Sequence, residues 1–116
     1  MECINRVELA GTVGACRLTQ AGGQTVARMS VATTIVYGDS AGKQVMETTW
    51  HNVVAWQKPG MADLGKISRG SAVHITGRLH YSKYTRSDGA EVLVCEILAD
   101  TLQVTEMQDV LDSIRS

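Results

Sequence analysis

The sequence predicts a small all-β domain, a five-stranded barrel, and three observations support that fold class. Short runs of β-branched and aliphatic residues alternate with polar residues at a period of two, the pattern of half-buried strands. Eleven glycines, against a single proline, separate these runs at positions typical of turns. The 116 residues are 44% hydrophobic, which is enough for one domain with an ordinary core.

The predicted elements follow the chain in a simple order. They are strands at residues 4–18, 25–37, 45–56, 72–79 and 90–98, with a helix at 59–70 before the fourth strand. The fourth strand continues through 80–86, and residues 100–104 extend the fifth. Turns are expected at 21–23, 39–42 and 87–89. Gly11 and Gly14 interrupt the first strand and predict a bulge or sharp bend within it.

The helix at 59–70 is predicted from apolar spacing. Met61, Leu64 and Ile67 recur every three residues, and a proline and a glycine stand at the two ends of the segment. Gly65, inside the segment, lowers helix stability by about 1 kcal/mol. We therefore expect one short helix between the third and fourth strands.

Three strands, a helix and two further strands make up the order of the OB-fold, a small β-barrel. We expect Leu93, Cys95 and Ile97 of the fifth strand to face its interior. Such barrels bind single-stranded nucleic acids or oligosaccharides on the face of strands two and three. The sequence predicts this domain over residues 1–105, with residues 106–116 as a short C-terminal extension, either an amphipathic helix or a frayed tail.

Composition excludes several classes of protein. A net charge of −1 does not fit a binder of duplex DNA, although a local basic stripe is compatible with it. Three widely spaced cysteines without a C-x-x-C pair indicate buried or half-buried thiols in a reducing cytosol rather than disulfides or structural zinc. The N-terminus lacks a signal-peptide pattern and no apolar stretch reaches about 18 residues, so we expect a cytoplasmic protein with no membrane partner.

Catalysis is not predicted. The histidines lie far apart, and no serine, cysteine or acidic cluster forms a nucleophile or two-metal motif. His51 is expected to make a structural or subunit-interface hydrogen bond rather than to bind a metal, whereas His74 and His80 are expected to be solvated. We therefore expect a binding protein that has no metal and no cofactor.

The third strand carries the most informative pattern. Alternation places Trp50, Asn52, Val54 and Trp56 on one face, while the other face has the side chains of a barrel interior, His51, Val53 and Ala55. Two indoles with an amide between them on an outer face indicate a binding surface. The alternatives are that Trp50 closes the core or that Trp56 packs against the helix.

The extension of the fourth strand carries a second candidate surface. One face of it combines basic, polar and aromatic side chains, namely Arg78, His80, Ser82, Tyr84 and Arg86. Lys83 and Tyr81 face the other way. Tyr84 can alternatively be an ordinary cross-strand aromatic.

Aromatic and basic side chains in combination suit single-stranded DNA. Stacking on aromatic rings contributes roughly 1–3 kcal/mol per base, and Lys and Arg contact phosphates. The candidate phosphate contacts are Arg6, Arg28, Lys43, Lys58, Lys66, Arg69, Arg78, Lys83 and Arg86. Each of these can instead serve only solubility.

Residues 4–105 resemble the bacterial single-stranded DNA-binding proteins, a family of OB-fold proteins. Residues 5–11 resemble the family's opening N-[KR]-V-x-L-x-G, and residues 31–34 its L-A-T-S. Residues 49–54 resemble T-[ED]-W-H-x-V-V, and residues 69–79 resemble K-G-S-x-V-x-[IV]-x-G-x-L. The resemblance implies sequence-independent binding of single-stranded DNA in replication, recombination and repair, by a nucleoid-associated protein.

The resemblance also implies particular roles and an assembly. The family's stacking positions fall on Tyr37, Trp50, Trp56 and Tyr84. Tyr37 has the alternation of the core residues of its strand, so it needs a bulge, or a position beyond the core, to reach a ligand. Family members form homotetramers, or dimers in the primosomal branch, and a homotetramer is expected here.

Two departures from the family pattern bear on partners. Residues 106–116 lack the family's acidic tip, which indicates a tail-less short form and puts tail-mediated recruitment of other proteins in doubt. Pro59 stands where the family helix usually starts without proline. The alternative function is an OB-fold module for protein assembly, of the primosomal accessory type.

Overall fold

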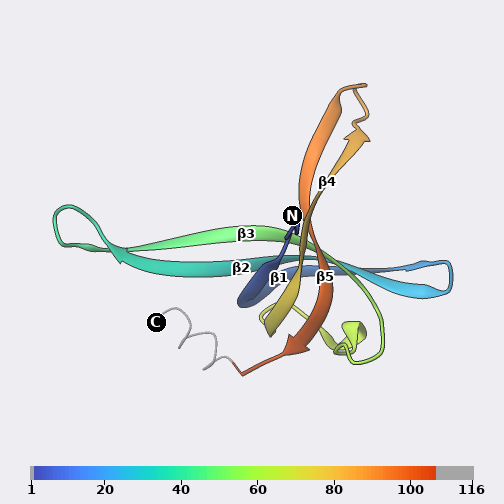
Figure 1. The fold of residues 1–116 in the computed structure, drawn as a ribbon, viewed down its shortest axis with the longest axis horizontal. Helices are drawn as coiled ribbons and strands as arrows, with labels where there is room; N and C mark the ends of the chain where they lie inside the picture. Colours follow the sequence, from blue (N-terminus) through green and yellow to red (C-terminus); the bar gives the residue numbers. More distant parts are fainter. Residues whose placement is uncertain (1, 107–116) are drawn as a thin grey trace.

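The computed structural model describes residues 2–106 as a closed five-stranded β-barrel with the strand order β1-β2-β3-β5-β4 (Figure 1). The elements are β1 (Val7–Ala21), β2 (Gln24–Gly38), β3 (Gln44–Trp56), the 3-10 turn η1 (Leu64–Lys66), β4 (Ala72–Thr85) and β5 (Glu91–Val104). All strand pairs are antiparallel except β3 and β5, which run parallel. The predicted all-β class, the OB-fold topology and the three turns are confirmed.

The core lies where all five strands curve around one another. Alternation brings one side chain in two from each strand to the inside, where valines and other β-branched residues pack well. The fully buried large side chains are Val31, Val53, Val73, Ile75, Leu102 and Leu64 of the 3-10 turn. No polar or charged residue is buried among the described residues, so the fold is held by apolar packing.

The segment between β3 and β4 forms less helix than the sequence predicts. Only Leu64–Lys66 is helical, as one 3-10 turn that starts where the Asp63 carboxylate accepts a hydrogen bond from the Gly65 N–H. Gly60 and Gly70 have positive φ angles of 84° and 92°, which end any regular helix. The predicted apolar spacing still has a structural role, because Leu64 and Ile67 are buried in the core.

Gly14 lies at an irregularity in β1 where the register with β2 shifts between Val13 and Ala15. This confirms the predicted bulge. Gly11 is required for a different reason, because the backbones of β1 and β2 pack closely there. An added Cβ would lie 2.1 Å from the Ala32 carbonyl oxygen. A bulged first strand can pair with β2 along one part of its length and with β4 along another, which closes the barrel.

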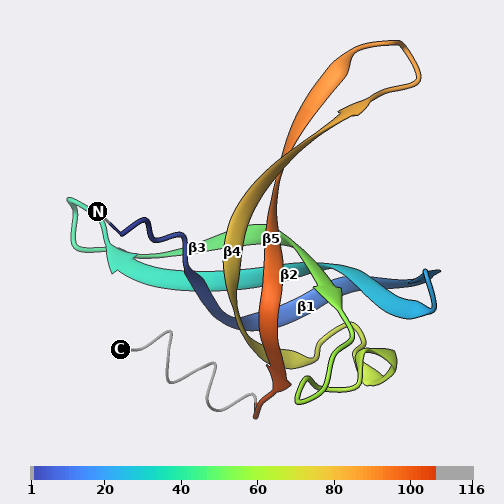
Figure 2. The same cartoon turned by 45° about the vertical axis from the view of Figure 1, so that its right-hand side comes forward.

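The strands are longer than the barrel needs, so they project from it as three two-stranded hairpins. Figures 1 and 2 show the β1–β2 and β2–β3 hairpins extending in opposite directions and the β4–β5 hairpin rising away from both. Hydrophobic side chains on these projections are exposed, among them Ile35, Met46, Tyr81 and Leu93.

The prediction that Leu93 and Cys95 face the barrel interior is wrong. Both lie on the projecting part of β5 and are exposed, whereas Ile97, nearer the barrel, is buried as predicted. Alternation assigned these three residues to one face correctly, but the barrel covers only the last of them. Cys3 is also exposed and Cys16 is partly buried, so only Cys16 fits the expected half-buried thiol.

No helix within residues 2–106 is long and apolar enough to cross a membrane. The predicted C-terminal extension, apart from Glu106, lies outside the described residues. The division at residue 105 therefore stays a prediction.

Candidate nucleic-acid interface

The outer face of β3 carries two exposed indoles. Trp50 is 60% exposed and Trp56 is 44% exposed, on the same side of the strand. Val53 and Ala55, on the other side, are buried as predicted. Trp50 is therefore not a core residue. At about 3.3 Å per strand residue, the two indoles stand about 20 Å apart, too far to sandwich one base but able to contact separate bases.

The indole of Trp50 lies across the neighbouring strands toward β1. Its six-membered ring sits so close to Gly14 that an added Cβ there would come within 2.5 Å of the ring. The glycine that makes the bulge thus also makes room for the indole. Beside it, the Ser30 hydroxyl accepts a hydrogen bond from the Ala15 N–H at 3.0 Å. The position of Trp50 is set by this local packing before any ligand arrives.

An open groove of about 860 Å³ joins the β3 face to the β4–β5 hairpin. Asn52 and Val54 line it from β3, and Ser82 and Tyr84 line it from β4. Tyr84 is exposed, so its ring is free to stack. The structure therefore brings together two of the surfaces that the sequence singled out separately.

Tyr37 lies apart from this groove. β2 pairs with β3 without a register shift up to Gly38, so no bulge turns Tyr37 toward the face of Trp50. Tyr37 stands opposite Val45, and Trp50 opposite Ala32, which places the two rings on opposite faces of the twisted hairpin. Tyr37 is exposed because it lies beyond the barrel, the second of the two possibilities left by its alternation.

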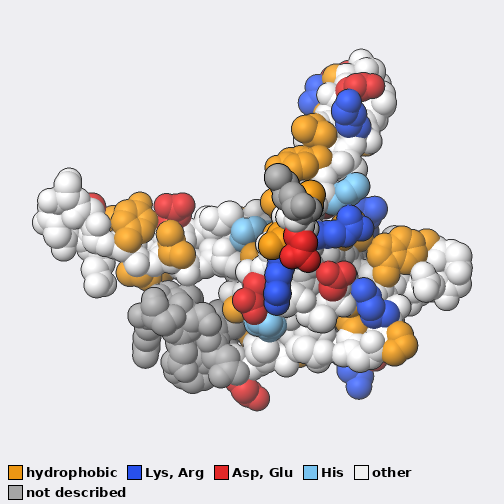
Figure 3. Space-filling view, in the orientation of Figure 1, with side chains coloured by type: hydrophobic (Ala, Val, Ile, Leu, Met, Phe, Trp, Pro, Cys, Tyr) orange, Lys and Arg blue, Asp and Glu red, His pale blue; other side chains and the backbone are white. Residues whose placement is uncertain are grey.

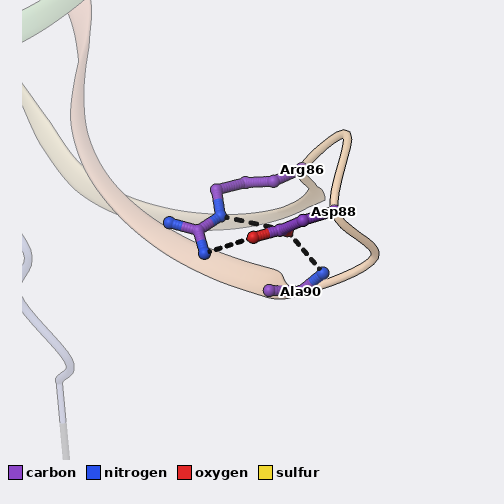
Figure 4. Close-up of polar contacts among 3 residues, drawn as sticks. All are labelled: Arg86, Asp88 and Ala90. Carbon is purple, nitrogen blue, oxygen red and sulfur yellow. Dashed lines mark hydrogen bonds and ion pairs between the residues drawn. The ribbon is translucent and has the colours of Figure 1, made fainter.

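The tip of the β4–β5 hairpin is held by its own polar contacts. Arg86 Nη2 donates to Asp88 Oδ2 at 2.9 Å, and the Ala90 N–H donates to Asp88 Oδ1 at 3.0 Å (Figure 4). These two partners, the Ala90 amide first, lower the pKa of Asp88 below its ordinary value. Arg86, a predicted phosphate contact, is thus paired within its own turn.

The other predicted basic residues do not form one stripe. Figure 3 shows basic and acidic side chains interleaved over the centre of the molecule, with hydrophobic side chains along the projections. The exposed ones lie in loops, in the 3-10 turn, or on opposite faces of β4, and they are Arg6, Lys43, Lys66, Arg69, Arg78 and Lys83. Lys58 reaches the Ala99 carbonyl at 3.5 Å, and Arg28 pairs with Glu96 at 3.0 Å.

His51 makes the structural hydrogen bond expected of it. Its Nε2 lies 2.9 Å from the Thr33 hydroxyl, and burial lowers the pKa of the imidazole. His80 is exposed as predicted, whereas His74 pairs with Glu8 at 2.8 Å rather than being only solvated. Within residues 2–106 no three potential ligands gather into a metal site.

Sequence reasoning missed one basic residue of the groove. Arg17 of β1 lines it and stands directly opposite Arg28. The bulge at Gly14 shifts the alternation of β1, so simple counting from Val7 puts Arg17 on the wrong face. Gly14 indicated a bulge in β1, but the glycine alone does not show on which face of the strand the residues after it lie.

The barrel and its exposed indoles define an OB-fold binding domain, and comparison with known proteins narrows this class. The sequence model of the Single-strand binding protein family matches residues 4–105. The chain therefore belongs to the single-strand binding protein family.

Three curated relatives agree with this assignment. The single-stranded DNA-binding proteins of Xanthomonas campestris pv. campestris and Xylella fastidiosa are each 38% identical over 104 residues. These matches cover 87% of this chain and 60% and 63% of those proteins, so the chain spans about three-fifths of their length. Single-stranded DNA-binding protein 1 of Chlorobaculum tepidum is 32% identical, over 91% of this chain and 67% of that protein.

Solved structures share the fold. The Plasmodium falciparum SSB in complex with ssDNA superposes with a TM-score of 0.77 at 25% identity, over 91% of this chain and 98% of that one. A single-stranded DNA-binding protein variant from Thermus aquaticus has a TM-score of 0.72 at 17% identity, over 90% of this chain and 52% of its own. The second likeness supports the barrel topology alone.

Proposed function

We propose that this protein binds single-stranded DNA without sequence preference, by stacking bases on exposed aromatic rings. The observation that carries this proposal is the pair of exposed indoles, Trp50 and Trp56, on one face of β3 in a member of this family. Every base has a π-face, so stacking is tolerant of sequence. The names of the curated relatives and the DNA-bound Plasmodium falciparum structure support the same ligand.

The groove suggests a path for single-stranded DNA across the protein. Trp50 lines a smaller hollow that adjoins the groove at Asn52. A base stacked on Trp50 is followed by Asn52, whose amide can bond a base edge, and then by Tyr84 on the facing hairpin. Trp56 continues the path at the end of β3. Tyr37 belongs to a second segment of the path, because it faces the other side of the β2–β3 hairpin.

Phosphates are contacted by whichever basic residues flank these rings. We keep the nine predicted contacts as candidates and add Arg17, which lines the groove. Arg86 and Arg28 need to leave Asp88 and Glu96, respectively, to serve a phosphate fully. The function needs no catalysis, metal or cofactor, and fits a nucleoid-associated protein that protects exposed strands in replication, recombination and repair.

Assembly follows from the small number of rings on one barrel. Single-stranded DNA that contacts several barrels of one oligomer binds with higher avidity, because each further contact is made within the same complex. We propose a homotetramer, with a dimer as the alternative. Partner recruitment by a C-terminal tail is not part of the proposal.

The test is binding of a labelled oligo-dT, followed by fluorescence anisotropy at several salt concentrations, with a duplex of equal length as control. We expect the single strand to bind more tightly than the duplex and its affinity to fall as salt rises. Trp50→Ala should weaken binding by about 1–3 kcal/mol. Val104→Ala, which removes a similarly exposed side chain at the end of β5 farthest from the β4–β5 hairpin, is the matched control. Unchanged affinity in a folded Trp50→Ala chain rules out the stacking mechanism.

A second candidate function is protein assembly, and one observation favours it. Leu79, Tyr81 and Leu93 are exposed on the face of the β4–β5 hairpin that points away from Tyr84. Exposed apolar residues at successive positions of one face are typical of a protein contact. Binding of a partner protein that survives replacement of both tryptophans, together with negligible affinity for oligo-dT, identifies this function instead.

A further inference from the structure

An ion pair crosses the outer face of β3 between Trp50 and Trp56. Arg28 Nη1 of β2 lies 3.0 Å from Glu96 Oε2 of β5, and β3 runs between these two strands. The pair is more than a surface contact, because the Glu96 side chain is only 13% exposed although that of Arg28 is 62% exposed. The carboxylate is thus well placed to hold the guanidinium in one position.

Val54, beside this ion pair, is shielded from solvent. Val54 shares the outer face of β3 with Trp50 and Trp56, yet it is only 7% exposed. Arg28 stands directly opposite Val54 on β2. The pair therefore covers the middle of the path between the two indoles, where a strand stacked on both of them has to pass.

The charges around Glu96 explain why a carboxylate lies in a surface that otherwise suits DNA. Arg17 and Arg28 stand directly opposite each other on β1 and β2, and like charges in that position repel. Glu96 offsets this repulsion by forming an ion pair with Arg28. Its other oxygen, Oε1, accepts a hydrogen bond from the Ser82 hydroxyl at 2.8 Å, which fixes the carboxylate.

We propose that Glu96 limits the affinity of this groove for DNA, because it holds Arg28 away from the phosphates. A phosphate that takes Arg28 leaves a largely buried carboxylate without its partner, which is unfavourable. In the parent protein Arg28 therefore contributes little to phosphate binding, and Glu96 keeps a negative charge beside the strand. The proposal rests on the function proposed above and assigns a tuning role to one of its residues.

The prediction is that Glu96→Gln tightens binding of oligo-dT and makes it more salt-dependent. Each phosphate contact on a single strand adds about 0.7 to the slope of log affinity against log salt. One released arginine should therefore steepen the slope by about 0.7 and raise the affinity on the order of fivefold at 0.1 M salt. Adding Arg28→Gln to Glu96→Gln should remove the extra slope, because no guanidinium is then released.

Anisotropy titrations of the parent, Glu96→Gln and the double variant at four salt concentrations separate the outcomes. A slope in Glu96→Gln equal to that of the parent, or a steeper one that persists in the double variant, overturns the inference. If thermal melting shows that Glu96→Gln is unfolded, Glu96→Asp replaces it, since the shorter side chain keeps the charge but withdraws it from Arg28. Absence of oligo-dT binding by the parent refutes the proposed function itself, whereas parent binding with no effect at Glu96 refutes this inference alone.

Discussion

The barrel and the three projecting hairpins are built from the same strands, but they differ in what their side chains contact. Within the barrel, alternate residues such as Val31, Val53 and Leu102 are buried completely. Farther along the same strands, Ile35 and Leu93 are exposed, although Ile35 keeps the alternation of Val31 and Leu93 that of the buried Ile97. The difference teaches that alternation sets which face a residue takes, whereas closure of the barrel decides whether that face is covered.

The hairpins also carry two of the rings expected to meet DNA, Tyr37 and Tyr84, whereas Trp56 stands on the barrel, opposite the buried Val26. A two-stranded ribbon is marginally stable alone, so each projection depends on the barrel from which it grows. Asn5 illustrates the link, because its amide both donates to and accepts from the backbone of Leu79, each at 2.9 Å, near where β4 leaves the barrel. The barrel thus supplies stability and part of the binding surface, and the hairpins extend that surface.

The largest expected difference between the two regions is in stability. Leu102→Ala removes a fully buried side chain and should lower the free energy of unfolding by about 2–5 kcal/mol. Leu93→Ala removes the same atoms from a side chain that is 60% exposed, so its effect should stay within about 0.5 kcal/mol. Urea unfolding of both variants measures this, and equal losses mean that the hairpin is packed in solution.

Substitutions at two glycines should likewise change stability in the barrel but not in a hairpin. A Cβ on Gly77 would lie 2.2 Å from the Leu98 carbonyl oxygen, so Gly77→Ala forces the backbones of β4 and β5 apart. We expect a loss of about 1–3 kcal/mol, as for other overpacked sites. Gly38, on the β2–β3 hairpin, has nothing within 4 Å of an added Cβ, and Gly38→Ala should melt like the parent. Matching melting temperatures for the two variants contradict the close approach.

Substitutions on the two faces of the β4–β5 hairpin should differ in their effect on DNA affinity. Tyr84→Ala removes a ring from the groove and should weaken oligo-dT binding by about 1–3 kcal/mol. Tyr81→Ala removes an exposed ring that does not line the groove and should weaken binding less than Tyr84→Ala. Anisotropy titrations compare the two variants, and a larger effect at Tyr81 indicates that the DNA runs over the face of Tyr81 instead.

The smallest expected effect is a pH dependence at the point where β2 and β3 leave the barrel. Burial lowers the pKa of His51, so the folded protein favours the neutral imidazole. As the pH falls below the ordinary histidine value of about 6.5, the unfolded chain takes up the proton first and stability decreases. The melting temperature of the parent should therefore fall more between pH 7.5 and pH 5 than that of His51→Gln. Parallel curves show that His51 does not contribute.

Much of the fold could be predicted from the sequence because β-branched alternation and glycine turns are local signals. The helix at 59–70 was overestimated for a physical reason, since Leu64 and Ile67 at a spacing of three suit an irregular loop that seals the barrel as well as they suit a helix. Gly60 and Gly70, both with positive φ angles, decide between the two. Their backbone conformation is fixed by the tertiary fold and is not visible in the sequence.

The candidate site was predictable in part. Trp50, Trp56 and Tyr84 are exposed on the faces that alternation assigned to them. Arg17 was missed because the bulge at Gly14 changes the alternation, and the Arg28–Glu96 pair because its partners lie 68 positions apart in the sequence. Contacts that cross a closed barrel depend on strand order and register, and neither can be read from one strand at a time.

The central claim is that the indoles on the outer face of β3 stack on bases, and tryptophan fluorescence tests it most directly. Trp56→Phe leaves Trp50 as the sole tryptophan, and Trp50→Phe leaves Trp56. Titration of each variant with oligo-dT at low salt should quench the remaining indole, and added salt should restore the emission. Binding measured by anisotropy without quenching of either indole contradicts stacking on β3.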